Sequence, residues 1–463
     1  MGRTILRDIS FITLVLLATL LVVATFIEKY YGAEVTREYV YHSPLFVILW
    51  MILAVSAMAY IVWVSRRVTL IMLHASLAVV LTGAFTSFMT SERGTILLTR
   101  DAVPASMFTT DDNSLEKLPF RMTLVDTDIY SSNGIHSARI AIESTEGCDT
   151  MDIALNSPAK TKGYSFCIKS ISDEHLSLLT SYDPWGVPIS YTGYLMTVIS
   201  FIALFCDRKG YFLSLWLRKR KRSVKRRRGW MPGLDSCIGA VLAVIAVLGI
   251  YRWYSTGMFP ITNGQECILF LTWLSFTMYI TAAYIKALKP FAPIFFTLGC
   301  VALIALPFMW KSGGGEIPPI LRTPLLGIHV STVIAAYVLL GGTAINASVA
   351  LWYKVVRDNE EKMERMAVIG RTLLYPATLL LTTGIFIGAM WADISWGRYW
   401  GWDPKEVWAL ITLIICSLTF HTRSLPFMAK ALDFHIFSLV AFIAMLFTFF
   451  GVNYLFGGLH SYM

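Results

Sequence analysis

Long apolar runs alternate with short polar connections along most of this 463-residue chain. About 20 apolar residues suffice to cross a bilayer as a helix, and several runs approach that length. The pattern predicts eleven spanning helices, at 9–27, 44–64, 68–89, 190–206, 234–253, 265–285, 290–309, 327–353, 372–391, 404–422 and 433–452. The first run is long, lacks an Ala-x-Ala-like site and continues into further spans. We therefore expect a retained helix, not a cleaved signal peptide.

The pattern changes between 90 and 188, where charged residues, Ser and Thr become frequent. The segments RMTLVDTDIYS and HSARIAIES alternate apolar with polar residues, which is typical of strands. The fold class expected is an all-α polytopic membrane protein of about eleven transmembrane helices with a small extracytoplasmic β-rich domain. The charged segment 354–371 is expected to be a solvated connector.

Composition supports a membrane protein. Hydrophobic residues make up 56% of the chain and charged residues 15%, whereas a soluble domain carries about a quarter charged residues. A soluble chain with one large core is excluded, because the apolar runs are long enough to span a bilayer.

The net charge of +9 is concentrated in the basic stretch 218–228. Such a run is also found in nucleic-acid-binding proteins, but here it lies between two apolar segments. Because cytoplasmic loops are rich in Lys and Arg, we expect this loop inside the cell, in contact with anionic lipid and not nucleic acid. Alternation then puts the segment 391–408 and the C-terminal tail outside.

Seven cysteines are present, without a Cys-x-x-Cys pair, so the chain is neither a c-type cytochrome nor a thioredoxin-like protein. Most lie in apolar runs. Cys148 and Cys167 lie in the polar segment, where a disulfide between them remains open.

The stretch 391–408, WADISWGRYWGWDPKEVW, holds five tryptophans between two apolar segments. Gly397 and Gly401 interrupt regular helix there. Indole faces at a bilayer edge suit a large planar hydrophobic ligand, because stacking requires no hydrogen bonds. Trp also collects at membrane interfaces as an aromatic belt. Composition alone leaves both interpretations open.

The segment from Trp396 to Glu406, WGRYWGWDPKE, resembles the WWD signature of haem-handling proteins of cytochrome c maturation. The tail FGVNYLFGGLHSYM and the segments YRWYSTG and PITN, at 251–257 and 260–263, resemble the system II member of that group. The first part of the chain is similar in plan to its ResB-type partner. The resemblance thus covers nearly the whole chain, as a fused ResB/CcsA-type protein.

This resemblance divides the chain into five parts: a ResB-like transmembrane part at 1–89, the β-rich domain at 90–188, a fourth transmembrane helix at 189–206, a basic cytoplasmic linker at 207–229, and a CcsA-like transmembrane domain at 230–463 with its WWD loop at 391–408. The β-rich domain is shorter than usual for the family, and its role beyond scaffolding or docking a partner stays open.

The expected topology sorts four histidines by depth. His74 and His421 fall in the cytoplasmic half, and His329 and His460 fall at the outer side, level with the tryptophans. Ionisable groups inside membranes are costly and usually functional, and imidazoles are common axial ligands of haem iron. The resemblance implies that His74 and His421 bind haem within the membrane and that His329 and His460 hold it at the exit. His435 matches no ligand position, and we expect it to be a packing residue.

The resemblance further implies a holocytochrome c synthase, a haem lyase of the bacterial inner membrane that moves haem b outward and joins it to the Cys-x-x-Cys-His motif of apocytochrome c. Trp396, Trp400 and Trp402 would contact the ring, Arg398 and Lys405 are candidate partners of the propionates, and Asp403 would hold the loop or orient a histidine. A thiol-reducing partner is a further expectation. The alternatives are a di-haem b-type electron-transfer subunit and a transporter of another amphipathic solute.

Overall fold

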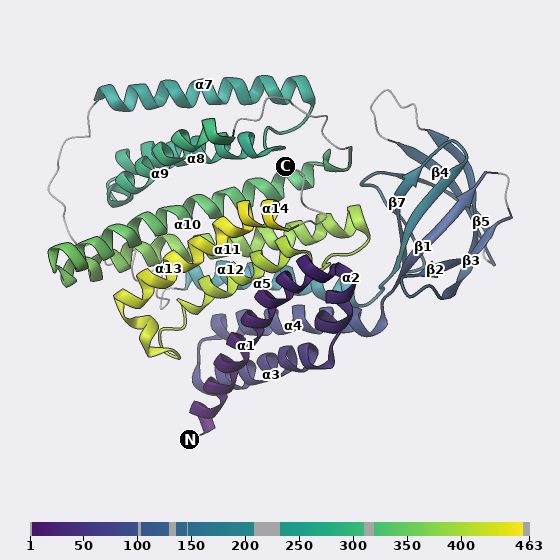
Figure 1. The fold of residues 1–463 in the computed structure, drawn as a ribbon, viewed down its shortest axis with the longest axis horizontal. Helices are drawn as coiled ribbons and strands as arrows, with labels where there is room; N and C mark the ends of the chain where they lie inside the picture. The colour runs from purple at the N-terminus through teal and green to yellow at the C-terminus, as the bar shows by residue number, and fades with distance from the viewer. Residues whose placement is uncertain are drawn as a thin grey trace.

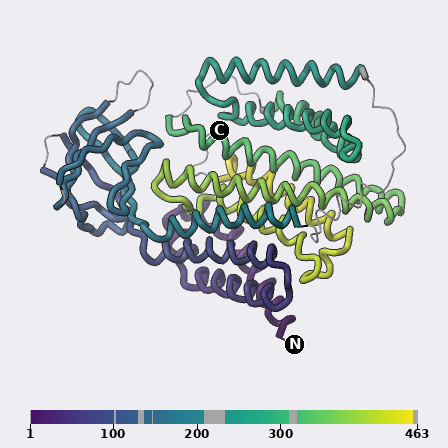
Figure 2. The backbone as a smooth tube through the Cα atoms, turned by 180° about the vertical axis from the view of Figure 1, so that it is seen from behind, coloured from purple at the N-terminus to yellow at the C-terminus, as the bar shows by residue number. Residues whose placement is uncertain are grey.

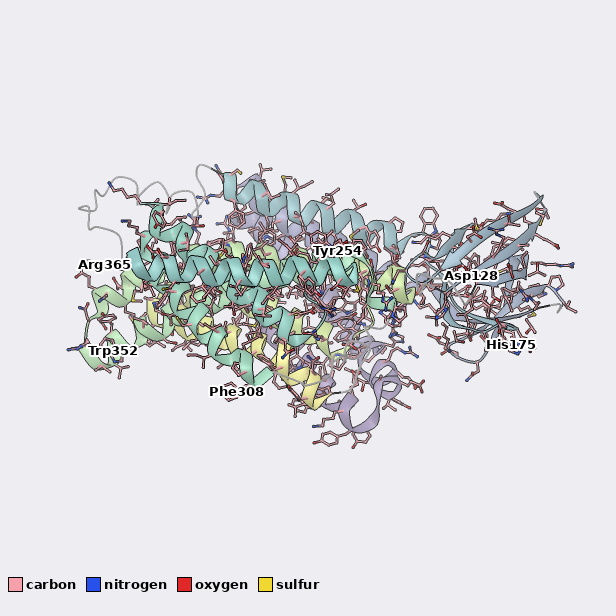
Figure 3. The ribbon with its side chains drawn as sticks, turned by 90° about the horizontal axis from the view of Figure 1, so that it is seen from above. Asp128, His175, Tyr254, Phe308, Trp352 and Arg365 are labelled. Atoms are coloured by element: carbon pink, nitrogen blue, oxygen red, sulfur yellow. The ribbon has the colours of Figure 1, made fainter. Side chains whose placement is uncertain are left out.

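The computed structural model describes residues 2–100, 103–128, 136–145, 147–207, 232–309 and 319–456. A bundle of long helices, roughly parallel or antiparallel to one another, carries a β domain at one end (Figures 1 and 2). Asp128 and His175 mark this end, and Trp352 and Arg365 mark the opposite one (Figure 3). We call these the domain end and the far end of the bundle. The basic linker predicted at 207–229 lies almost wholly outside the described residues.

The longer helices are α1 (Gly2–Tyr31), α3 (Pro44–Val64), α4 (Val68–Thr90), α5 (Gly186–Cys206), α7 (Pro232–Thr256), α8 (Gly264–Tyr284), α9 (Ala292–Ala305), α10 (Pro324–Arg357), α11 (Glu360–Trp396), α12 (Pro404–Leu418) and α13 (Ala431–Leu446). Short helical turns join them: α2 (Ala33–Thr36), η1 (Arg37–Tyr41), η2 (Lys289–Phe291), η3 (Leu306–Met309), η4 (Pro319–Leu321), η5 (Pro426–Ala429), η6 (Phe447–Gly451) and α14 (Val452–Leu455).

Ten of the described helices are long and apolar enough to span a membrane, which confirms a multi-pass membrane protein. The one predicted span that is missing from these ten, 404–422, contains α12, which has 15 residues. At about 1.5 Å per residue α12 is shorter than a bilayer core.

The segment 354–371 was predicted to be a solvated connector, and this prediction is wrong because most of the segment is helical. Helix α10 continues to Arg357, and α11 already starts at Glu360. Asp358, at φ 45°, ends α10 in the left-handed region. Charged residues therefore mark helix ends that extend past the apolar core, not an irregular loop.

The β domain confirms the predicted change of character after residue 90. Its strands are β1 (Glu92–Thr99), β2 (Ala105–Thr110), β3 (Leu115–Asp128), β4 (Ser137–Ser144), β5 (Gly147–Ala154), β6 (Ala159–Thr161), β7 (Tyr164–Ile171) and β8 (His175–Tyr182). Their order is β5-β4-β3-β2-β1-β8-β7-β6, with antiparallel neighbours. Strand β5 also lies near β7, so the sheet curls into a barrel-like shape (Figure 1). The core contains Phe108, Met122, Ile140, Phe166 and Leu178.

The disulfide left open by the sequence is not formed. Cys148 is exposed on β5, Cys167 is buried on β7, and both are free thiols.

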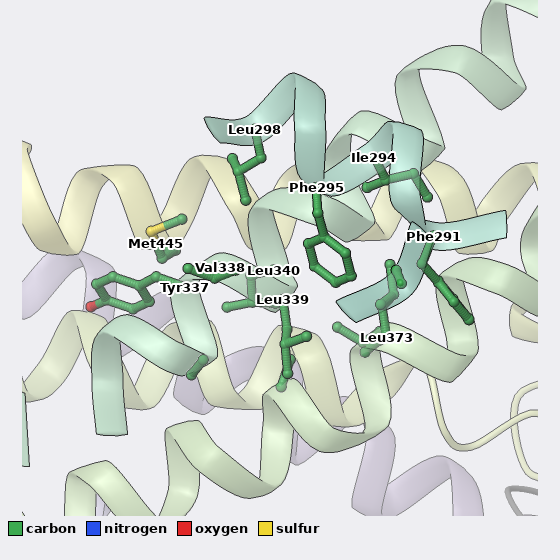
Figure 4. Close-up of a cluster of buried hydrophobic side chains, with 14 of the residues drawn as sticks. Phe291, Ile294, Phe295, Leu298, Tyr337, Val338, Leu339, Leu340, Leu373 and Met445 are labelled. Carbon is green, nitrogen blue, oxygen red and sulfur yellow. The ribbon is translucent and has the colours of Figure 1, made fainter. Parts of the chain in front are cut away.

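The largest apolar core joins α9, α10, α11 and α13 (Figure 4). Phe295 and Leu298 of α9 face Leu339 and Leu340 of α10, and Leu373 of α11 closes the cluster. A second core joins the N-terminal helix to α12, through Leu17 and Leu21 against Val407 and Ile411. The N-terminal helix α1 therefore packs into the same bundle as the C-terminal helices.

Helices α4 and α5 approach so closely that small residues are required between them. A Cβ added to Gly83 would lie 2.5 Å from the backbone nitrogen of Ser190, and one added to Gly193 would lie 2.8 Å from that of Val80. In membranes, small residues allow such contact between helix backbones. This contact joins the helix before the β domain to the helix after it.

Replacing Gly83 by Leu should force α4 away from α5, because the obstructing atoms are backbone and cannot rotate away. Overpacking typically costs about 1–3 kcal/mol, so we expect a melting temperature lower by several degrees in detergent. Gly239→Leu in α7 is the matched control, since a Cβ there meets nothing within 4 Å. Equal melting temperatures for the two variants would contradict this packing.

Candidate functional site

Two of the candidate histidines meet at the far end of the bundle. His74 lies in the second turn of α4, and His421 follows the end of α12. Their ring centroids are 6.1 Å apart, and the ring planes are nearly perpendicular at 87°. The structure thus brings together two side chains that are far apart in the sequence.

A backbone carbonyl orients each of these two rings. Nδ1 of His74 is 2.8 Å from the Leu70 carbonyl oxygen, and Nδ1 of His421 is 2.9 Å from that of Ser417. A neutral imidazole that donates from Nδ1 carries its lone pair on Nε2. Such hydrogen bonds fix the tautomer and ring orientation of metal-binding histidines. The pair is therefore arranged as two potential ligands.

Arg371 of α11 holds the connection that carries His421. Its guanidinium donates to the carbonyl oxygens of Thr419, at 3.1 Å, and Met428, at 2.7 Å. It also lies 4.3 Å from the centre of the Phe434 ring. A buried cation needs such partners, and carbonyls at a helix C-terminus favour positive charge. Arg371 was not among the residues predicted from the sequence, although one Arg beside a long apolar run is a visible signal.

His435 is fully buried in α13, and its Nε2 is 3.1 Å from the Met363 carbonyl oxygen. It packs edge-on to Phe434, with centroids 5.4 Å apart. These contacts give it the surroundings of a packing residue.

His329 lies near the start of α10, at the domain end. Its Nδ1 is 2.7 Å from the Gly384 carbonyl oxygen in α11. Its ring covers Gly388, where an added Cβ would lie 2.6 Å from Cε1. The imidazole therefore packs directly against α11 at Gly388, where a side chain would leave no room for it. His460 lies outside the described residues, so the distance between these two histidines is not tested.

The loop predicted at 391–408 is shorter in the structure, because helices extend into both ends of this stretch. Helix α11 includes Trp391 and ends at Trp396, and Gly397, at φ 69°, caps it in the left-handed conformation. Helix α12 starts at Pro404. The irregular part is therefore 397–403.

Two carboxylates fix this loop. The Asp403 side chain accepts from the Lys405 backbone N–H, and Glu406 accepts from the backbone N–H groups of Asp403 and Gly401. Together they form a capping box that begins α12. Trp402, at φ 58°, adopts a backbone conformation that is uncommon for a bulky residue. The caps on both sides hold it there.

The indoles differ in their surroundings. Trp391 is buried and lies edge-on to Trp396, with centroids 6.3 Å apart. Trp402 stacks on Tyr41 of η1 at 4.7 Å, with ring planes 11° apart, and Trp400 meets it edge-on at 5.7 Å. Trp396 and Trp400 are half-buried, and their indole N–H groups are buried without an acceptor among the described residues. Such donors are rare and costly.

Positive charge gathers beside the loop. The Arg398 guanidinium covers Gly401, where a Cβ would lie 3.0 Å from Cζ. Burial, and next the nearby Arg398, lowers the pKa of Arg93 on β1. Lys405 donates from Nζ to Asn453 of α14 at 3.0 Å, so it ties α12 to the segment before the C-terminal tail. Arg93 was missed because its strand is distant in sequence.

Residues of the β domain and α5 contact the last turn of α11. Asp393 is buried, accepts from the Tyr191 hydroxyl at 3.0 Å and lies 3.6 Å from Lys160 Nζ. The Tyr399 hydroxyl lies 3.0 Å from Ser87 Oγ. Three parts of the chain, α4, α5 and the β domain, therefore position the tryptophans. Tyr191, Lys160 and Ser87 lie outside the aromatic stretch, whereas Asp393 and Tyr399 belong to it.

Residues 261–460 match the family described as Cytochrome C assembly protein. The chain is 32% identical over 238 residues to protein NrfI of Wolinella succinogenes, which covers 49% of this chain and 26% of NrfI. It is 29% identical over 301 residues to the cytochrome c biogenesis protein CcsA of Guillardia theta, covering 57% of this chain and 94% of that protein.

With CcsA of Populus trichocarpa the chain shares 31% identity over 262 residues, which cover 46% of this chain and 80% of that relative. The family match includes the segment 396–406 and part of the C-terminal tail. The chain belongs to the cytochrome c assembly family of system II cytochrome c biogenesis proteins, with CcsA and NrfI.

Proposed function

We propose that this protein moves haem outward across a membrane and attaches it to apocytochrome c, as a holocytochrome c synthase. Its place in cytochrome c biogenesis follows from the family. The far end of the bundle would then face the cytoplasm and the domain end the periplasm of a bacterial inner membrane. The observation that carries the proposal is the contact between His74 and His421.

The far-end pair fits haem better than a simple metal ion. Imidazole nitrogen binds a metal at about 2.0–2.1 Å, so two axial rings have their centres about 6 Å apart, counting about 1 Å within each ring. The observed separation is 6.1 Å. The described residues contain no group of three or more His, Cys, Asp and Glu side chains that could hold a metal ion. Haem brings four nitrogens of its own, so two histidines would suffice to complete the coordination of its iron.

The domain end supplies groups suited to a second haem position. His329 is oriented by a carbonyl of α11, and we assign it as an axial ligand together with His460 from the C-terminal tail. Trp396, Trp400 and Trp402 would pack against the porphyrin. The unpartnered indole N–H groups of Trp396 and Trp400 and the guanidinium of Arg398 suit propionate carboxylates, which are hydrogen-bond acceptors.

Lys405 and Asp403 have structural partners in addition to any role toward haem. Lys405 binds Asn453, and Asp403 caps α12. We therefore assign Asp403 to holding the loop and keep Lys405 as a second cation near the propionates. Both would act by fixing where the ring and its carboxylates lie.

Attachment requires no nucleophile from this protein. Each substrate thiol adds across a haem vinyl group: sulfur bonds to one vinyl carbon, and the hydrogen goes to the other. No oxidant is consumed, and the thiols must be reduced beforehand, which implies a thiol-reducing partner. The contribution of the site is positioning, which can remove several kcal/mol from a bimolecular barrier. Exchange of a protein histidine for the histidine of Cys-x-x-Cys-His would release the product.

The far-end pair gives a first test. His421→Gly should lower haem affinity by at least about 10-fold to 100-fold, the loss typical when only the hydrogen-bond partner of a ligand is removed. Added imidazole should restore it. His435→Gln is the matched control, because this nearby buried histidine has packing contacts. The measurement is the b-type absorption of the purified protein titrated with haem. Unchanged affinity in His421→Gly would overturn the assignment.

The whole function is tested by co-expression with an apocytochrome c in cells without other maturation machinery. The unmodified protein should give covalent haem on the reporter, and His329→Ala should reduce it at least about tenfold through loss of an axial ligand. His175→Ala, an exposed histidine of β8, should have no effect.

Stoichiometric haem that stays on the protein, without reporter product, would favour an electron-transfer subunit. Absence of any haem binding would favour transport of another amphipathic solute.

A further inference from the structure

One asparagine of the β domain contacts both α11 and the short turn η4 that precedes α10. Asn156 lies in the turn between β5 and β6. Its Nδ2 donates to the Ile320 carbonyl oxygen at 2.8 Å, and its Oδ1 accepts from the Ser395 hydroxyl at 2.7 Å. The side-chain amide thus uses a donor and an acceptor toward two separate segments.

Those two segments are the ones that position the candidate site. Ile320 belongs to η4, directly before the start of α10, which carries His329. Ser395 precedes Trp396 at the end of α11. A shift of the Asn156 turn would therefore change the position of the start of α10 relative to the end of α11.

Neighbouring contacts hold the same turn of α11. Lys160 of β6 lies 3.6 Å from the buried carboxylate of Asp393. The Cys167 thiol of β7 lies 3.5 Å from the Ile394 carbonyl oxygen. Three consecutive α11 residues, 393–395, are thus contacted by one edge of the β domain. The domain is docked on the helix end that begins the tryptophan loop.

We propose that Asn156 is a positioning residue for haem attachment, through which the β domain holds η4 and the end of α11 in register. The proposal rests on the proposed function and gives the shortened domain a task. Under this proposal, Asn156 contacts neither haem nor substrate. It acts on His329 and Trp396 indirectly, through the Ile320 carbonyl group in η4 and the Ser395 hydroxyl group in α11.

The backbone of Asn156 dictates the choice of variant. Its φ of 61° is in the left-handed region, where Gly is free of strain and Ala is not. Asn156→Gly therefore removes both hydrogen bonds without backbone strain. Asn113, also at φ 61° and exposed in the β2–β3 turn, gives the matched control Asn113→Gly.

Docking can be measured without haem through Cys167. This thiol is buried, and burial raises its pKa to about 12, so it should react slowly with a maleimide at neutral pH. Cys148 is exposed on β5 and serves as an internal reference in peptide-level mass spectrometry. In the full-length protein, Asn156→Gly should raise the Cys167 labelling rate about tenfold through local opening. Asn113→Gly should leave it unchanged.

A second experiment measures covalent haem on the reporter cytochrome c. Asn156→Gly should lower covalent haem several-fold, while haem bound by His74 and His421 in a His329→Ala background stays constant. A general loss of stability would lower both. Asn156→Asp is a second variant, since it keeps the acceptor for Ser395 and loses the donor to Ile320. We expect an intermediate yield.

Unchanged Cys167 labelling in Asn156→Gly would overturn the proposal, as would faster labelling with a normal yield of reporter. Equal effects of Asn113→Gly would overturn it as well. If the unmodified protein gave no covalent haem, the proposed function would fail instead. The labelling comparison would then still decide whether Asn156 holds the domain.

Discussion

A backbone carbonyl that accepts from Nδ1 orients each of the three candidate histidines within the described residues. The acceptors are Leu70 for His74, Ser417 for His421 and Gly384 for His329. Where water is excluded, the protein itself must satisfy the ring nitrogens, and this bond leaves the Nε2 lone pair for a ligand. Everything proposed for the two ends of the bundle depends on this orientation.

The same bond has different consequences at the two ends. For His74 and His421 the acceptor is four residues earlier in the chain, so the orientation of each ring is fixed by the preceding turn of its own segment. Their meeting then depends on how α4 and α12 pack, and on Arg371, which holds the chain after α12. For His329 the acceptor belongs to another helix. Its orientation is therefore coupled to the position of α11 and to whatever holds the end of α11.

That helix end is held by α5 and by the β domain. Tyr191 of α5 and Lys160 of β6 reach Asp393, and Asn156 reaches Ser395. Tyr41 of η1 stacks on Trp402 further along. The N-terminal part, the β domain and the C-terminal helices thus meet at the tryptophans. A single chain keeps these parts at a high local concentration, and the contacts then fix their geometry.

The sequence by itself determined the membrane class, most of the helices and the β domain, because length, apolar composition and alternation are local properties. It also indicated a break of helix at Gly397, a residue that favours a left-handed helix cap, but it placed the loop at 391–408, whereas the irregular part is 397–403. Tertiary structure decided which faces meet. Several helices, among them α3, α7 and α8, are apolar on all sides, so no stripe in their sequences shows which face packs. The contacts of His74 with His421, Tyr41 with Trp402 and Asn156 with Ser395 join residues distant in the chain, and packing of the whole bundle was needed to bring them together.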